Sequence, residues 1–582
     1  MKIRLAKTAG FCMGVRRAVD MVLDLQRDSP ALPIVTYGPL IHNPQTLELL
    51  RSRGILEVES LDQITGGTVV IRAHGISPVE RRALKDKGVG IIDATCPRVS
   101  RVQAVIRKHA EKGYFCVIVG DEDHPEVRGL MGFATAGSIA VPSCQGNGFL
   151  DSLPTDRDIC VVAQTTQDIE TFDGVVNLIK GRCRNLHVCN TICDSTKNRQ
   201  AEVSQMSRHV DLVVVVGGKG SGNTQRLVKV AQAQGISALH VETDEDIPSQ
   251  AFVGVGSVGV TAGASTPNWQ IRRVTDRLKE IEMIRTPSFV KQIRRISDVA
   301  VMTYVWAAVA GGGLTATCLV LQSRRVTWLP LAVTMLFVFS MHLLNRIQER
   351  TGAVRFNTPE IASFYARHRG LLTLLGVLSS VAAVALGFWM GLYAGLLVTA
   401  MLVTGRLYTV PLIAAPRVPW LRWRSLKDLP GSKTPLVALG WAASAVVLPV
   451  IGSGKSPPLP VTAVAFVFAA GMVFWRTALS DLLDIQGDRM VGRETIPILI
   501  GVKNTRKLLQ ALLVLLGLLL AGSSVSGIIP PLGMWLVLNT LVFGCFFAVF
   551  RQRHLVDRLF FEGIVDGNFL LAGIISIVYG SW

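Results

Sequence analysis

The stretch DLVVVVGGKGSGNTQRL (residues 211–227) contains the folding plan of the N-terminal half of the chain. A short run of β-branched residues predicts a strand, the glycine- and serine-containing stretch predicts a loop, and the residues that follow predict an amphipathic helix. Three other stretches repeat this order: TVVIRAHGIS (68–77), FCVIVGDEDHPE (115–126) and GSVGVTAGAST (256–266). Strands that alternate with helices in this way predict an α/β fold with largely parallel sheets.

The polar loops of these units predict where a ligand binds. In open α/β sheets, ligands gather beyond the carboxyl ends of the strands. The loop histidines, serines and asparagines are therefore expected to converge. A single histidine or serine in such a loop is more often an ordinary hydrogen-bonding residue, so the set carries the inference and its members alone do not.

Three cysteines mark a coarser repeat. Cys12, Cys96 and Cys193 lie at similar spacings in the turn-like stretches GFCMG, ATCPR and TICDS. Three comparable α/β lobes, each giving one thiolate to a common centre, are the predicted geometry. Spacing alone leaves open that each is a small buried hydrophobic residue. We expect that role for six others: Cys116, Cys144, Cys160, Cys183, Cys318 and Cys545.

The composition changes sharply near residue 295 of this 582-residue chain. Charged, polar and apolar residues are mixed before this point, as in soluble proteins, whereas long apolar runs separated by basic loops follow it. Many of these runs reach the roughly 17–25 residues that a helix needs to cross a bilayer. The sequence therefore predicts an all-α membrane domain of about nine transmembrane helices behind an α/β domain.

The formal net charge of +18 fits this membrane topology. Many of the excess basic residues border apolar runs, which is the positive-inside pattern, and no nucleic-acid-binding motif competes with it. The N-terminus lacks the apolar core of a secretory signal. We therefore expect a multi-pass protein of the inner or plasma membrane, with its N-terminal half in the cytoplasm and its cysteines reduced.

Seven stretches lie in order between residue 1 and about residue 282: AGFCMGVRRAV, DATCPRVSRV, GDEDHPEVRG, AQTT, TICDSTKNRQ, VVGGKGSGNTQRL and GVTAGAST. They resemble signatures of the 4-hydroxy-3-methylbut-2-enyl diphosphate reductases, the IspH/LytB family. The resemblance implies that residues 1–284 form an iron–sulfur oxidoreductase. Its reaction is the last step of the non-mevalonate isoprenoid pathway, a reductive dehydroxylation that yields isopentenyl and dimethylallyl diphosphate. Since GGKGSGN (217–223) does not fit the dinucleotide fingerprint, electrons are expected from a partner protein. The resemblance implies that this partner is a ferredoxin or flavodoxin.

The same resemblance implies roles for individual residues. Cys12, Cys96 and Cys193 would hold a [4Fe–4S] cluster whose open iron binds the substrate, with Cys189 as the rival of Cys193. Glu126 would donate the proton, and His124 and Thr165 would complete the relay, while Asp121, Glu122 and Asp123 are expected to be solvated. The diphosphate-binding positions would be His42, His74, His124, Ser221, Asn223 and Ser265. One departure from the family is Gly222, which stands where a second serine is common.

A second resemblance concerns the membrane half. RTALSDLLDIQGDRMVGRETIPILIGV (476–502) sets Asp481, Asp484 and Asp488 on one face of a helix. It resembles the second Asp-rich motif of UbiA-type prenyltransferases, and LYTVPL (407–412) with SLKDLPGSKTPLVALGWA (425–442) resembles an earlier loop of theirs. The resemblance covers residues 299–582 and follows a predicted linker at 285–298. It implies Mg²⁺-dependent prenyl transfer.

The first Asp-rich motif of that family is eroded in this chain. Asn345 is present, Glu349 stands for the first aspartate, and Ala353 occupies the position of the second. Fewer carboxylates weaken the capture of a Mg²⁺–diphosphate. Two alternatives therefore stay open: a second enzyme with unusual metal use, or a degenerate scaffold that only tethers the reductase. A third, an iron–sulfur sensor without turnover, would not need the diphosphate-binding set.

Overall fold

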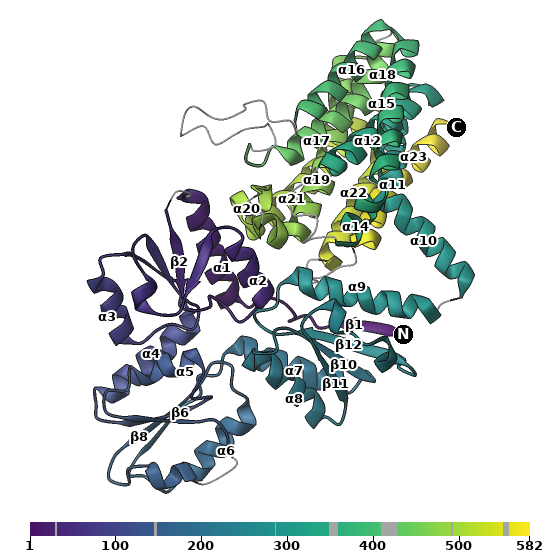
Figure 1. Ribbon diagram of the computed structural model, residues 1–582. Helices are drawn as coiled ribbons and strands as arrows, with labels where there is room; N and C mark the ends of the chain where they lie inside the picture. The colour runs from purple at the N-terminus through teal and green to yellow at the C-terminus, as the bar shows by residue number, and fades with distance from the viewer. Residues whose placement is uncertain are drawn as a thin grey trace. The chain divides into compact units, whose positions relative to one another are not determined.

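The chain forms two compact units in a computed structural model, Met1–Arg285 and Thr286–Trp582. The structure describes all residues except 30–31, 145–147, 286, 349–358, 409–428, 455–456, 491–492, 551–557 and 582. The first unit is α/β and the second is helical (Figure 1). Most of the segment expected to be a linker, 285–298, lies in helix α10 (Ser288–Met302), which belongs to the second unit.

Three four-stranded sheets, which we call A, B and C, form the first unit, and all of their strand pairs are parallel. Sheet A has the order β1 (Lys2–Leu5), β12 (Ser257–Ala262), β10 (Leu212–Val216), β11 (Ser237–Val241). Sheet B has the order β3 (Ile55–Val58), β2 (Ile34–Tyr37), β4 (Thr68–Ile71), β5 (Gly90–Asp93). Sheet C has the order β7 (Ser138–Val141), β6 (Phe115–Val119), β8 (Ile159–Ala163), β9 (Leu186–Cys189).

Helices join the parallel strands, because such strands need a crossover connection. The helices of this unit are α1 (Met13–Asp28), α2 (Pro44–Arg51), α3 (Pro78–Asp86), α4 (Pro97–Ala110), α5 (Pro125–Met131), α6 (Ile169–Ile179), α7 (Asp194–Ser207), α8 (Gly222–Ala233) and α9 (Asn268–Arg285). The central strands β8 and β10 are buried along their whole length, as apolar strands covered on both faces should be. The predicted α/β fold of three similar lobes is confirmed.

The second unit consists of helices. They are α10, α11 (Val305–Leu321), α12 (Trp328–Gln348), α14 (Pro359–Arg367), α15 (Arg369–Met390), α16 (Leu392–Leu407), α17 (Lys433–Ala442), α18 (Leu448–Gly452), α19 (Leu459–Met490), α20 (Ile496–Ile500), α21 (Val502–Val525), α22 (Leu532–Phe550) and α23 (Arg558–Gly580). Helix α11 packs against α12 and α23, α12 packs against α15, and α17 packs against α19. Their shared core includes Leu314, Phe468 and Trp475.

Seven of the described helical segments are long and apolar enough to span a membrane, or eight if the bent pair α10–α11 counts as one span. Helix α16 is apolar but shorter. The predicted count of nine is therefore approximate. On α15, Leu371, Leu374, Leu378 and Val381 are all more than half exposed, as side chains that face lipid would be. The multi-pass membrane character of this unit follows from these helices.

Candidate active site

Each sheet of the first unit presents one cysteine at an equivalent position. Cys12 follows β1, Cys96 follows β5 and Cys193 follows β9, and each of these strands lies at an edge of its sheet. Each cysteine is also the N-cap residue of the next helix, α1, α4 or α7. Helix N-termini favour negative charge, so these positions suit thiolates.

One hydrogen bond recurs in all three lobes and fixes the cysteine loops. The backbone N–H of Cys12 donates to the carbonyl of Ala264, that of Cys96 to the carbonyl of Ala73, and that of Cys193 to the carbonyl of Thr165. Each N···O distance is 2.9 Å. Every acceptor lies in the loop after the strand next to the edge strand, namely β12, β4 or β8. The parallel pairing of these strands therefore brings each cysteine beside a second candidate site loop.

Arginines from the three cysteine-capped helices reach from one lobe to the next. Arg17 on α1 donates to the carbonyl of Thr95 at 3.0 Å, immediately before Cys96. Arg98 on α4 pairs with Asp194 at 2.5 Å, immediately after Cys193. The buried Arg199 on α7 donates to the carbonyl of Gly10 at 2.6 Å, two residues before Cys12. These three arginines therefore form a ring of contacts that links all three lobes, which we call the arginine ring. Sequence reasoning missed all three, because each contact joins segments far apart in the chain.

The cysteines form a donor set that suits a metal cluster. Burial and the charges of neighbouring cysteines raise the pKa values of Cys96 and Cys193, so these two thiols resist ionising without a cation nearby. Bound iron would relieve this by coordinating the thiolates. Cys189 differs, because it lies at the end of β9, hydrogen-bonds with Cys160, and does not line the pocket that contains Cys193.

Three histidines gather beside the cysteines. His42 follows β2, His74 follows β4 and His124 follows β6, and their ring centroids lie 4.4 to 5.4 Å apart. Burial lowers the pKa of all three, that of His124 to about 4. A positive charge on one ring would also disfavour protonation of the ring beside it. The imidazoles are therefore neutral at pH 7, with each ring offering one N–H donor. His42 Nε2 and His74 Nδ1 are buried without a partner among the described residues.

Sheet A supplies the remaining polar groups of the site. Ser221 caps α8, with its Oγ accepting from the backbone N–H of Thr224 at 3.4 Å. Both amide atoms of Asn223 are buried without a partner among the described residues, so this side chain is ready for a polar ligand. Ser265 follows β12 and donates to the carbonyl of His42 at 2.9 Å. These groups join sheet A to the histidine cluster of sheets B and C.

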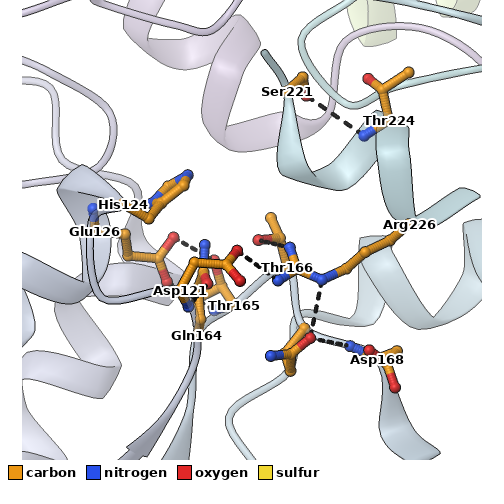
Figure 2. Close-up of polar contacts among 11 residues, drawn as sticks. Asp121, His124, Glu126, Gln164, Thr165, Thr166, Asp168, Ser221, Thr224 and Arg226 are labelled. Carbon is orange, nitrogen blue, oxygen red and sulfur yellow. Dashed lines mark hydrogen bonds and ion pairs between the residues drawn. The ribbon is translucent and has the colours of Figure 1, made fainter. Parts of the chain in front are cut away.

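Glu126 is a buried carboxyl group near the start of α5, only 2% exposed. It accepts hydrogen bonds from the backbone N–H of Thr165 at 2.7 Å and from its Oγ1 at 2.9 Å. Burial raises the pKa of Glu126 and outweighs these bonds. Figure 2 shows Glu126 facing Thr165, with His124 on the same loop. A carboxyl group that stays protonated to higher pH suits a proton donor.

Asp121 was expected to be a solvated loop residue, but it pairs with Arg226 on α8 at 2.8 Å. Arg226 is buried and also donates to Gln167 at 2.9 Å. The side chain of Gln164 accepts from the backbone N–H of Asp121 at 3.1 Å. This network, defined by Asp121, Gln164, Gln167 and Arg226, joins sheet A to the loops that hold Glu126 and Thr165.

All predicted site residues of the first unit line one pocket. Its empty volume, which includes open solvent at the mouth, is about 740 Å³. The residues are Cys12, Cys96, Cys193, His42, His74, His124, Glu126, Thr165, Ser221, Asn223 and Ser265. The arrangement can hold a thiolate-ligated metal group, an anion and one proton donor within a single cavity.

The fold and this pocket define a three-lobed α/β protein with one cysteine from each lobe at its centre. Residues 3–279 match the LytB protein family, and the chain belongs to this family. Residues 299–561 match the UbiA prenyltransferase family, so the second unit is a UbiA-like domain.

Individual relatives match one half of the chain or the other. The chain is 43% identical over 287 residues to the 4-hydroxy-3-methylbut-2-enyl diphosphate reductase of Solidesulfovibrio magneticus, covering 48% of this chain and 99% of the relative. A solved structure of (E)-4-hydroxy-3-methyl-but-2-enyl diphosphate reductase is 38% identical, with a TM-score of 0.38, and the match covers 48% of this chain and 100% of that one. A UbiA homologue from Archaeoglobus fulgidus, bound to DMAPP and Mg²⁺, is 17% identical, with a TM-score of 0.35 and coverage of 47% and 96%.

Two of the three aspartates predicted to hold a metal ion in the membrane domain have cationic partners. Asp481, Asp484 and Asp488 lie on the single helix α19 and are buried. Asp481 already accepts from Lys433 at 2.7 Å and from Thr434 at 2.8 Å, and Asp488 pairs with Arg493 at 3.7 Å. These partners neutralise part of the acidic motif. Asn345 lies near the C-terminal end of α12, whereas Glu349 and position 353 lie outside the described residues.

Gly14 allows α1 and α4 to approach closely at the cysteines. A Cβ atom at this position would lie 2.4 Å from Cys96 Sγ. We expect Gly14→Ala to destabilise the protein by about 1–3 kcal/mol through overpacking and to lower its iron content. Gly66→Ala is the control, because a Cβ atom added there would meet nothing within 4 Å. Iron analysis and thermal unfolding test the expectation, and equal iron contents in the two variants would contradict it.

The ion pair Arg226–Asp121 is expected to contribute more to the free energy of unfolding than a surface ion pair does. A double-mutant cycle of Arg226→Gln and Asp121→Asn should give a coupling energy of about 1–3 kcal/mol, because the guanidinium is buried. The exposed pair Arg128–Asp123, in the same loop region, is the matched control and should give at most about 1 kcal/mol. Denaturant unfolding measures both cycles. Equal coupling energies in the two cycles would show that the burial of Arg226 does not strengthen its ion pair.

Proposed function

We propose that the first unit reduces 4-hydroxy-3-methylbut-2-enyl diphosphate to isopentenyl and dimethylallyl diphosphate. The observation that carries this proposal is the convergence of three cysteines, one from each lobe, with an anion-binding set and a buried carboxyl group. The named reductases that share 38% to 45% identity with this chain support the reaction. The match covers nearly their whole length, so it includes every lobe of the reductase fold.

A [4Fe–4S] cluster held by Cys12, Cys96 and Cys193 is the cofactor that we propose. When bound, it would supply electrons and an open iron for the substrate hydroxyl. Three thiols at helix N-termini fit such a group, because each thiolate is favoured there and the arginine ring lies around them. The electrons would come from a partner protein such as ferredoxin or flavodoxin.

The polar residues would bind and orient the diphosphate. His42, His74 and Asn223 are poised to donate hydrogen bonds, since their side-chain atoms are buried without described partners. A bound diphosphate would favour protonation of the neutral histidines by charge attraction. His124, Ser221 and Ser265 would complete this set. Gly222 leaves one side-chain donor fewer than the family pattern, and backbone N–H groups at the start of α8 can substitute.

Glu126 would deliver the proton that the departing hydroxyl needs. The hydrogen bonds from Thr165 hold the carboxyl group in one orientation, and burial raises its pKa, which favours the protonated form. The carbonyl of Thr165 also accepts from the backbone N–H of Cys193. Thr165 is therefore hydrogen-bonded both to the carboxyl group of Glu126 and to the third cysteine. This coupling supports the relay of His124, Glu126 and Thr165.

The division of labour that we propose is a reductase in residues 1–284 and a UbiA-like membrane domain in residues 299–582, joined by residues 285–298. The positive-inside pattern supports a cytoplasmic reductase and an inner or plasma membrane location. The first unit would then act on an isoprenoid diphosphate, and the second unit would lie in the bilayer.

The membrane domain is proposed to transfer a prenyl group with Mg²⁺ at Asn345, Glu349, Asp481, Asp484 and Asp488. Three buried aspartates on one helix favour this activity, because buried carboxylates in a membrane are costly without a role. The alternative is a non-catalytic scaffold, and the ion pair between Lys433 and Asp481 favours it, because that carboxylate is already neutralised.

Purified protein with Mg²⁺, a prenyl diphosphate and lipid acceptors distinguishes these two roles. We expect transfer by the unaltered chain and a loss of about 100-fold in Asp488→Asn, because losing metal binding removes several kcal/mol of stabilisation. Reductase activity of the same variant is the control and should not change. Absence of transfer with every acceptor would favour the scaffold.

A further inference from the structure

Helix α10 presents an apolar stripe to its surroundings. Phe289, Ile293 and Ile296 are 71%, 53% and 63% exposed, and Val290 beside them is 49% exposed. Their spacing places Phe289, Ile293 and Ile296 on one face of the helix. A stripe of this size on a soluble helix would ordinarily be covered by a partner.

The opposite face of α10 is basic. Lys291, Arg294 and Arg295 lie on it, with Asp298 as the one acidic residue of the helix. Arg295 is exposed and Arg294 is half-buried. A helix with large apolar residues on one side and cationic residues on the other is suited to lie in the plane of a membrane surface.

The connection of α10 to the next helix agrees with such a position. Helix α11 begins after Tyr304, which has a left-handed φ of 63°, and the two helices are bent by 69°. With 17 largely apolar residues, α11 is long enough to enter the bilayer without help from α10. At its C-terminal end α10 packs against α11 and α23, where Val301 is buried. The end of α10 is thus fixed to the membrane domain while its apolar stripe stays exposed.

We infer that α10 is an interfacial helix that binds an anionic phospholipid surface, with its apolar stripe among the acyl chains and its arginines among the headgroups. The inference rests on the membrane domain of the proposed function. Cationic side chains gain about 1 kcal/mol each near an anionic surface, so lipid charge should matter. The helix would then anchor the start of the membrane domain at the bilayer surface.

The test uses the full-length protein in nanodiscs of phosphatidylcholine, with or without phosphatidylglycerol. A fluorescent amino acid replaces Ile293 on the stripe, Arg295 on the basic face, or Leu538 on the lipid-exposed side of α22. Spin-labelled lipids quench it from near the headgroups or from near the bilayer centre. We expect headgroup-level quenching at 293 to exceed that at 295 by about threefold and to be stronger in anionic nanodiscs.

Several outcomes would overturn the inference. Equal exposure of positions 293 and 295 to aqueous iodide would place the helix in water, and protection of 293 from both lipid and iodide would mean that protein covers the stripe. Quenching of 293 mainly from the bilayer centre would make α10 part of a span. Position 538 separates the two proposals, because deep quenching there with none at 293 refutes only the interfacial helix.

The charge dependence has its own variant. Arg294→Gln with Arg295→Gln should reduce headgroup-level quenching at 293 in anionic nanodiscs to the level seen in neutral ones. Arg128→Gln, in an exposed ion pair of the first unit, is the control and should leave the quenching unchanged. Unaltered quenching in the double variant would contradict the role of anionic lipid.

Discussion

Cys193→Ser should yield a protein that binds little iron and has lost at least about 100-fold of its reductase activity, because a cluster site of three thiolates loses one ligand. The same result is expected for Cys12→Ser and Cys96→Ser, since the three cysteines occupy equivalent positions after the edge strands of their sheets. Iron analysis and turnover under anaerobic conditions measure both effects.

Cys189→Ser is the matched control for the third ligand. Cys189 lies four residues before Cys193 but at the end of β9, where it hydrogen-bonds with Cys160 and does not line the pocket. We expect this variant to keep its iron and its activity. If Cys189→Ser lost the cluster and Cys193→Ser kept it, the assignment of the third ligand would be wrong.

Glu126→Gln should bind substrate normally but turn over about 100- to 10,000-fold more slowly, which is the usual contribution of a general acid. The amide has nearly the same shape and can still accept a hydrogen bond from Thr165, so the change removes the proton and little else. Substrate binding, measured by titration, and turnover should therefore separate. Glu122→Gln, on an exposed residue of the same loop, should match the unaltered protein.

The raised pKa of Glu126 also predicts a pH dependence. Burial favours the neutral carboxyl group, so the acid form persists above the pH at which an ordinary glutamate ionises. Activity and the stability from this group should be present at low pH and decline as pH rises through the raised pKa. Glu126→Gln should lose this part of the dependence of stability on pH.

A turnover rate in Glu126→Gln equal to that of the unaltered protein would refute the proton-donor role.

The sequence predicted the lobes of the first unit well for a physical reason. Buried parallel strands are continuous apolar runs, and the cysteine, histidine and serine loops follow them directly, as in VVVVGGKGSG before α8. His42 and His74 follow neighbouring strands of sheet B, so the ends of those strands bring them together, whereas His124 follows a strand of sheet C. The strands and the loops that follow them are local in sequence, so pattern alone could predict them.

Contacts between lobes could not be predicted in the same way. Arg226 and Asp121 are 105 residues apart, and the acidic surroundings of Asp121 in its own loop indicated a solvated residue. The ring of Arg17, Arg98 and Arg199 depends on how three lobes meet, which no local pattern encodes. In the membrane domain, the partner of Asp481 is Lys433 on another helix, so the sequence could predict the acidic motif but not its neutralisation.

The most direct test of the central claim is the iron and sulfide content of protein purified without oxygen, followed by assay with 4-hydroxy-3-methylbut-2-enyl diphosphate and a reduced electron donor. We expect roughly four iron and four sulfide per chain and conversion to both isopentenyl and dimethylallyl diphosphate. Protein that contains no cluster, or that holds one and leaves this substrate unchanged, would contradict the claim.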